Sequence, residues 1–434
     1  MSQNQDAKSL KRTVDLWGVI ALGLGSAMGV SIFSVLGEAT RLAGAGLLIA
    51  VVLAALPMAF VAVAYAFMGT VLPTSGASYE WPRRFIHPTV GFAVSWLRIA
   101  SNTGALIVLA LVLTRYINMV VQVPERPMMF IMLTLMYVAN ILGIGIASRV
   151  QKFMMAGLLI VFGVFCVSAI ATGKADAANL VPHLQPGWHG ILAALPLLVS
   201  LFFGIEAATE IGEEIKSGKK IVATGILVSI LSAVFVYLAV AATAIAVLGS
   251  SVLGTAEAPM GSAMEAVFGK TGVYVVALAA FLAIAKSMNA IFMVFSRSLY
   301  AMATKGALPT PFAKVHPKWG TPYVACSAVY GFALLGLLLP SELTFLFLAV
   351  NLPVLIKYFC ICVCARRALK ESPDLAHNFA LSGPAVRLSA GIGMFMAIGI
   401  FALGFDTDWR PYAALAAWLA IGLIFYAFRK FLNR

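Results

Sequence analysis

Long runs of apolar residues, separated by short polar segments, repeat along almost the whole chain. A helix needs about 20 apolar residues to cross the hydrocarbon core of a bilayer. Runs of that length predict an all-α polytopic membrane protein, because a helix satisfies its own backbone hydrogen bonds in lipid. We predict twelve transmembrane helices, near residues 14–37, 42–70, 89–121, 127–146, 150–172, 191–214, 221–249, 272–303, 321–339, 342–365, 384–404 and 409–431.

Two of the predicted helices are interrupted near their middle. The first contains a glycine-rich stretch over residues 23–29, and the sixth contains Phe203, Gly204 and Glu206. Such glycines can serve only to let helices pack closely. We favour a functional interpretation, because the two breaks occupy the first helix of each of two five-helix halves. Paired interruptions of this kind indicate an inverted repeat with a substrate site at mid-membrane.

This pattern predicts four parts of the chain. A cytoplasmic tail over 1–13 precedes a first five-helix repeat over 14–172. A second, inverted five-helix repeat covers 191–365, and two peripheral helices follow over 384–431. The substrate site is expected between the two repeats.

The backbone at the two breaks has a distinct chemistry. Unpaired N–H and C=O groups are costly in lipid, so an unwound segment is expected to face a polar cavity. The half-helix that begins near Val30, Ser31 and Ile32 would present N–H groups and a positive dipole end to a carboxylate. Carbonyl groups before it, and those near Phe203, would hold an ammonium group. A zwitterionic amino acid would place its carboxylate at the N–H groups and its ammonium group at the carbonyl groups.

Composition and charge support the membrane interpretation. Hydrophobic residues make up 62% of the chain and charged residues 11%, against about 25% charged in soluble domains. The net charge of +13 could suggest nucleic-acid binding. Most Lys and Arg residues, however, fall in segments that would be cytoplasmic if the N-terminus is, which the positive-inside rule predicts for both termini. We therefore expect a cell inner membrane location and no nucleic-acid partner.

Catalytic and metal-binding clusters are not visible in the sequence. Cys360, Cys362 and Cys364 lie inside an apolar run without a second ligand group, which is typical of small buried apolar residues. The five histidines fall in predicted loops. We therefore expect no enzyme activity, no metal and no cofactor.

Four motifs, in order, resemble the amino acid–polyamine–organocation transporters along nearly the whole chain. The first, Gly25 to Phe33, is similar to the Gly-x-x-x-Gly-Ser-Gly-Ile-Phe pattern of that family. The sequence Phe203-Gly204-Ile205-Glu206 resembles its sixth helix. It is followed by Glu213 to Lys216, which is similar to the loop after that helix. The other two motifs are Pro73 to Tyr79 with Gly91-Phe92 and Trp96, and Arg297 to Met302 with Gly306 to Pro309 and His316 to Pro322.

The resemblance implies a leucine-transporter type of fold, with substrate held by the broken first and sixth helices and bounded by the third and eighth. Val30 and Ser31 stand where the family usually has Ser and Gly, and Ser200 replaces a frequent gating aromatic residue. We expect Phe202 or Phe203 to close over the substrate instead. The candidate substrate-binding residues are Ser26, Ala27, Met28, Gly29, Val30, Ser31, Ile32, Thr103, Phe202, Phe203, Gly204, Glu206 and Ile291, with Asn102, Ser200 and Asn289 nearby.

Ionisable residues at membrane depth are functional candidates because they are costly to bury. They are Arg98, Glu206 and Lys286. Several sodium-independent relatives place a lysine in the fifth helix, where Leu158 stands here. Lys286, with Ser287, falls near the same ion site, and desolvation favours release of a buried lysine's proton. We expect Lys286, Ser287 and Glu206 to couple transport to protons rather than sodium, although Lys286 could instead be tied permanently to carbonyl groups.

The sequence thus predicts alternating-access transport of amino acids, by proton coupling or exchange. A polyamine or another organic amine is the alternative substrate. A channel is the rival class, but it would need polar rings along a continuous path, whereas the two breaks converge on one site. The expected partners are a small-molecule substrate and the lipid bilayer, with the chain as a monomer or a homodimer.

Overall fold

The computed structural model describes residues 16–27, 31–72, 77–143, 148–181, 187–204 and 221–432, and these residues form helices and connecting segments without strands. Short 3₁₀ turns join some of the helices. The α-helices are α1 (Leu16–Ala27), α2 (Ser31–Ala43), α3 (Leu47–Val71), α4 (Ala77–Phe85), α5 (Pro88–Asn118), α6 (Glu125–Ile141), α7 (Ser148–Ala171), α8 (Gly187–Leu198), α10 (Ile221–Thr255), α11 (Pro259–Phe268), α12 (Lys270–Thr304), α13 (Tyr323–Gly336), α14 (Leu343–Glu371), α15 (Gly383–Thr407) and α16 (Arg410–Leu432).

The expected all-helical membrane architecture is confirmed in its main features. Within the described ranges, seven helical segments are long and apolar enough to cross a bilayer, and α8 and α13 are shorter apolar helices. Each of the twelve predicted intervals overlaps at least one helix. The number of crossings and the inverted repeat stay predictions. Two helices, α4 and α11, were not anticipated, because they are shorter than a membrane span.

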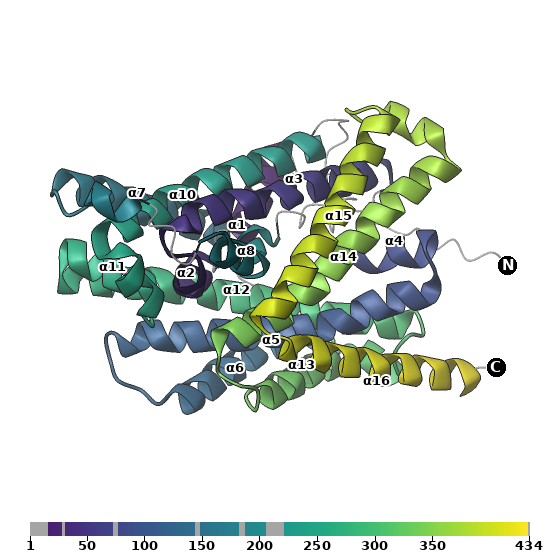
Figure 1. Ribbon diagram of the computed structural model, residues 1–434. Helices are drawn as coiled ribbons and strands as arrows, with labels where there is room; N and C mark the ends of the chain where they lie inside the picture. Colours follow the sequence, from purple (N-terminus) through teal and green to yellow (C-terminus); the bar gives the residue numbers. More distant parts are fainter. Residues whose placement is uncertain are drawn as a thin grey trace.

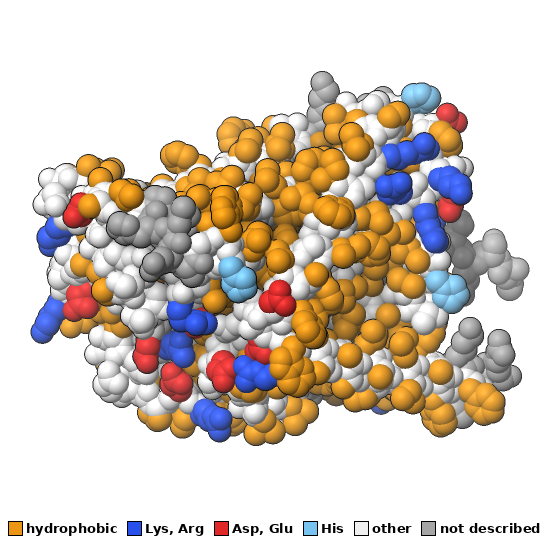
Figure 2. Space-filling model, viewed as in Figure 1, with side chains coloured by type: hydrophobic (Ala, Val, Ile, Leu, Met, Phe, Trp, Pro, Cys, Tyr) orange, Lys and Arg blue, Asp and Glu red, His pale blue; other side chains and the backbone are white. Residues whose placement is uncertain are grey.

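The helices form a bundle with charged ends and an apolar middle. In Figure 1, α14 and α15 lie side by side and cross the bundle obliquely, while α16 runs next to α5. Figure 2 shows charged side chains mainly at two ends of the visible face, with a broad hydrophobic surface between them. Exposed large side chains such as Phe235, Leu388 and Phe395 belong to the apolar surface that a bilayer would cover.

Both predicted interruptions involve helix ends. The first helix stops at Ala27, and α2 starts at Ser31. At the second interruption, α8 ends at Leu198 and a 3₁₀ turn, Val199–Phe202, follows it. Gly204 then has φ of +92°, a left-handed conformation that favours glycine. The second predicted interruption is therefore non-helical at Gly204. At the first, residues 23–27 are helical and residues 28–30 lie outside the described part of the chain.

The last helix is fixed to α5 by a pair of tryptophans. Each indole N–H donates to the other residue's carbonyl oxygen: Trp96 to Trp418 at 2.8 Å, and Trp418 to Trp96 at 3.0 Å. Their rings stack with centroids 4.9 Å apart. Gly422 lies so close that an added Cβ would be 2.3 Å from the Trp96 ring. A small residue is needed at this contact because the ring already fills the space.

We expect Gly422→Ala to destabilise the protein by about 1–3 kcal/mol, because overpacking displaces the Trp96 ring. Melting of purified protein in detergent measures the effect. Gly399→Ala in α15 is the matched control, because its Cβ would meet nothing within 4 Å. A melting temperature that falls equally in both variants would contradict the close contact.

Candidate functional site

A single hydroxyl group joins the two broken segments. Tyr237, buried in α10, lies with its hydroxyl 2.8 Å from the Ala27 carbonyl oxygen and 2.9 Å from the Leu201 carbonyl oxygen. Ala27 is the last residue of α1, and Leu201 lies in the 3₁₀ turn Val199–Phe202; carbonyls near a helix end can accept donors from other parts of the chain. A phenol has one proton, so the two acceptors share it. Tyr237 therefore holds the end of α1 beside the turn that follows α8.

The two phenylalanines of the second break point to different helices. Phe202 is fully buried and packs edge-on against Tyr237, with ring centroids 6.0 Å apart. Phe203 is only half-buried and packs edge-on against Tyr358 of α14, also at 6.0 Å. Phe202 thus belongs to the packing around the junction, and Phe203 is the more accessible of the two. Which of them closes over the substrate stays a prediction.

Helix α14 supplies a polar contact to the second break that the sequence analysis missed. The amide of Asn351 donates to the Pro196 and Leu197 carbonyl oxygens at 2.8 and 3.2 Å. These carbonyls lie at the end of α8, where intrahelical donors run out. The Asn351 Oδ1 is buried and has no hydrogen-bond partner among the described residues. An asparagine inside a proline-containing apolar helix was the available signal.

Predicted polar residues of α5 and of the 3₁₀ turn Val199–Phe202 donate to backbone carbonyls. Thr103 is half-buried and donates to the Ile99 carbonyl oxygen at 2.8 Å, and its methyl group lies next to Gly336 of α13. Asn102 and Arg98 are also half-buried. Ser200 donates to the Leu197 carbonyl oxygen at 2.7 Å. Their roles with substrate stay predictions.

The predicted coupling residues lie in the middle of α12. Lys286 and Ser287 are buried, and Ile291 is half-buried one turn further on. Helix α7, which carries the buried Leu158, packs against both α1 and α12. The Asn289 Oδ1 accepts a hydrogen bond from the Asn140 amide nitrogen of α6 at 2.8 Å. Asn289 therefore faces α6, while the coupling role of Lys286 stays a prediction.

A second buried lysine was missed. Lys357 lies midway along α14 and is 4% exposed. Arg98, Glu206 and Lys286 were predicted at membrane depth, but the predicted span 342–365 also contains Lys357. The signal was present, because an ionisable residue inside an apolar run is a functional candidate by itself.

Several predicted site positions lie outside the described part of the chain. Met28, Gly29, Val30 and Glu206 lie outside the described residues, as does the sequence around Glu213. For Ser26 and Ser31 the structure describes the backbone, which is helical at both positions. Ala27 and Ile32 flank the first break and are fully buried.

Charged contacts tie helices together at both ends of the bundle. At the predicted outer end, Glu38 of α2 pairs with Arg41 at 3.0 Å and accepts from the Thr344 hydroxyl of α14 at 3.1 Å. At the predicted inner end, Glu80 of α4 pairs with Arg83 and, at 3.0 Å, with Lys305 after α12. The hydrogen bond from Arg83 and the nearby Lys305 hold the pKa of Glu80 below its usual value.

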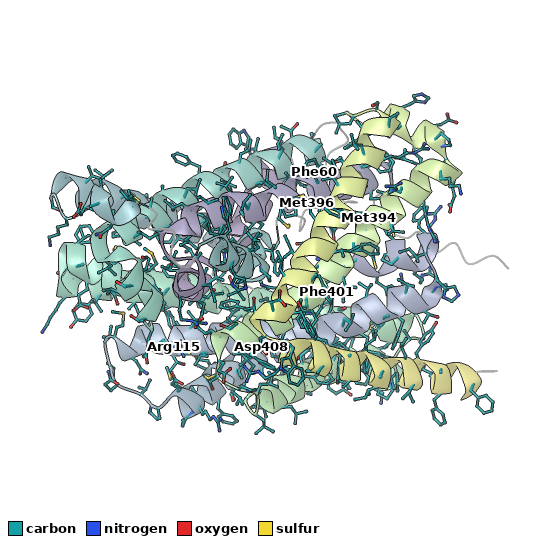
Figure 3. All side chains as sticks on the ribbon, viewed as in Figure 1. Phe60, Arg115, Met394, Met396, Phe401 and Asp408 are labelled. Atoms are coloured by element: carbon teal, nitrogen blue, oxygen red, sulfur yellow. The ribbon has the colours of Figure 1, made fainter. Side chains whose placement is uncertain are left out.

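A further ion pair lies between the last helices. Asp408, at the junction of α15 and α16 (Figure 3), accepts hydrogen bonds from Arg410, which also pairs with Glu342 before α14. Burial favours a higher pKa for Asp408, but the hydrogen bonds and charge of Arg410 outweigh it and lower the pKa. Asp408 therefore stays ionised at neutral pH, and its pair with Arg410 weakens only as the pH falls.

Comparison with known proteins matches almost the whole chain. A family model described as amino acid permease covers residues 14–429. A branched-chain amino acid permease of Bacillus subtilis is 27% identical, over 96% of this chain and 93% of the relative. A methylthioribose transporter of the same organism is 23% identical, over 98% and 95%. A low-affinity putrescine importer of Escherichia coli is 23% identical, over 78% and 77%.

Proposed function

Because this chain belongs to the amino acid permease family, we propose that it carries neutral amino acids across the membrane by alternating access, without sodium. The protein is a multi-pass membrane transporter and not an enzyme. The similarity to a branched-chain amino acid permease supports an amino acid as substrate. The similarity to a putrescine importer supports an amine as the alternative.

The observation that carries this proposal is the contact of Tyr237 with both broken segments. Its hydroxyl brings the last carbonyl of α1 and the Leu201 carbonyl to within one hydrogen-bond length of the same atom. Helix ends that meet inside a bundle leave backbone acceptors and donors near one point. The start of α2 at Ser31 adds N–H donors and a positive dipole end. Such a place suits the carboxylate and the ammonium group of an amino acid.

Sodium independence is supported by the buried lysine of α12. Lys286 is 7% exposed, and its helix packs against α7, which packs against α1 in turn. A fixed ammonium group there would take the place of a bound sodium ion. Proton coupling and exchange are the two modes that remain under this proposal.

Uptake by the purified protein in proteoliposomes tests the proposed function. We expect saturable uptake of labelled leucine that continues when sodium is replaced by choline, and faster uptake when the vesicles are preloaded with unlabelled leucine. Preloading accelerates a carrier, because the loaded site returns across the membrane, whereas a channel gives flux that does not saturate. Absence of uptake for all neutral amino acids would refute the proposal.

Ser31→Pro tests the carboxylate position. Ser31 is the first residue of α2, and proline is well tolerated at the first position of a helix. The substitution therefore removes one N–H donor and leaves the helix intact. We expect leucine binding to weaken about tenfold, as for loss of one charge-assisted hydrogen bond, with an unchanged melting temperature of the ligand-free protein. Equal affinity in a folded variant would place the carboxylate elsewhere.

A further inference from the structure

Three exposed basic side chains lie where α14 ends and α15 begins, at the predicted inner end of the bundle. Arg366 and Lys370 are one helical turn apart on α14, and Arg387 lies near the start of α15. Residues four positions apart share a face of a helix. Figure 2 shows Lys and Arg side chains gathered over the region where these two helices meet in Figure 1. We call these three residues the basic cluster.

Contacts between the two helices bring the guanidinium groups together. The Arg387 Nη2 donates to the Leu369 carbonyl oxygen of α14 at 2.9 Å. In the opposite direction, Arg366 reaches α15, where a Cβ added to Gly391 would lie 2.8 Å from its Nη1. Gly391 is one turn after Arg387, and Leu369 is about one turn after Arg366. The two guanidinium groups therefore lie at neighbouring turns of the same helix pair.

The basic cluster has no acidic partner in the described part of the chain. None of its three members forms an ion pair with a carboxylate there. Glu371 and Asp374 follow in the sequence and are exposed, and Asp374 lies 4.0 Å from His377 instead. The neighbouring Arg367 points to α4 and donates to the Phe85 carbonyl oxygen at 2.9 Å. Like charges one turn apart repel each other, so an anion from outside the chain would stabilise the basic cluster.

An apolar surface begins directly beside the basic cluster. Leu388 follows Arg387 in α15, and Phe395 lies two turns further on the same face; both side chains are largely exposed. This face belongs to the surface that a bilayer would cover. Acyl chains would therefore lie along α15, while a lipid head group would lie at the end of the helices, next to Arg387.

A phosphate group matches the chemistry of the basic cluster. Arginine holds a phosphate through two parallel hydrogen bonds, and basic pockets between transmembrane helices bind anionic lipid head groups on the cytoplasmic side. A phospholipid would use both the cations and the apolar face of α15, whereas an inorganic phosphate ion would use the cations alone. The continuity of the two surfaces therefore favours the lipid.

We propose that Arg366, Lys370 and Arg387 form a binding site for the phosphate group of an anionic phospholipid, whose acyl chains cover the face of α15 that carries Leu388 and Phe395. The positive-inside rule explains on which side of the membrane basic residues lie. It does not require them to converge from two helices without an acidic partner. The inference goes beyond transport, and its test uses no transported substrate.

Melting of the purified full-length protein in a neutral detergent tests the inference. Added dioleoyl phosphatidylglycerol should raise the melting temperature, because a ligand that binds the folded state stabilises it. The double substitution of Arg366→Gln and Lys370→Gln leaves the contact of Arg387 with α14 in place. We expect it to weaken phosphatidylglycerol binding at least about tenfold, since each basic residue near a head group contributes to the attraction.

A second double variant removes the same number of charges elsewhere. Lys314 and Lys318 are exposed after α12, at the same predicted end of the protein. Lys314→Gln with Lys318→Gln should therefore bind phosphatidylglycerol like the wild type. An equal loss of affinity in both double variants would overturn the inference, because overall charge would then explain the binding. Unchanged affinity in the variant at Arg366 and Lys370 would overturn it as well.

The wild-type protein provides a measurement that needs no variant. Dioleoyl phosphatidylcholine has the same acyl chains but carries a choline cation, so at the same mole fraction it should leave the melting temperature unchanged. Inorganic phosphate at the same concentration should also have no effect. If phosphatidylcholine stabilises as strongly as phosphatidylglycerol, the apolar surface alone binds lipid. If inorganic phosphate does so, the site binds a phosphate ion. Either result would overturn the inference and leave the proposed transport function untouched.

Discussion

Transport should fall at least about tenfold in Lys286→Met, the largest functional effect we expect from one side chain. Lys286 is buried in the middle of α12. An ionisable side chain at membrane depth costs free energy to bury and therefore usually has a functional role. Methionine preserves length and volume and removes the ammonium group that would replace sodium. Initial rates of leucine uptake in proteoliposomes measure the loss.

A lysine-to-methionine substitution at the start of α12 tests whether the loss depends on the position of the charge or only on the removal of a lysine. Lys270 is the first residue of α12 and is exposed, so Lys270→Met should transport at the wild-type rate. Lys286→Arg should fail like Lys286→Met, because arginine does not release its proton. The hypothesis is wrong if Lys286→Met keeps the wild-type rate, or if the wild type stops when sodium is removed.

Removal of the Tyr237 hydroxyl should weaken substrate binding and lower stability together. In Tyr237→Phe the ring that packs on Phe202 remains, while the Ala27 and Leu201 carbonyls lose their shared donor. Loss of one intramolecular hydrogen bond costs about 0.5–1.5 kcal/mol. We expect a lower melting temperature and leucine binding weaker by about tenfold.

A second tyrosine serves as the control. The Tyr330 hydroxyl of α13 lies 2.8 Å from the Thr134 hydroxyl of α6, and neither helix contains a break. Tyr330→Phe should cost stability but leave the affinity of the folded protein for leucine unchanged. If Tyr237→Phe behaves in the same way, the Tyr237 hydroxyl only supports the fold and does not form the site.

The membrane class and the positions of the breaks could be predicted from the sequence. Apolar runs must become helices in lipid, because no water satisfies the backbone there. Glycine weakens a helix locally, and the chain leaves the helical conformation at Gly204, as the sequence predicted. The first predicted break falls between the described helices α1 and α2. The motifs resembling the family were also confirmed by the match over residues 14–429.

The partners of the breaks were decided only by tertiary structure. Tyr237 and Asn351 satisfy carbonyl groups 210 and 155 positions away in sequence, and no local pattern selects one buried polar side chain in a helix for such a contact. Lys357 was visible as a charge in an apolar run, but its aromatic neighbour Tyr65 comes from another helix. Composition and periodicity determine which segments enter the membrane. Packing between distant helices determines which polar groups meet, because a side chain of one helix supplies the hydrogen-bond partner that the end of another helix lacks.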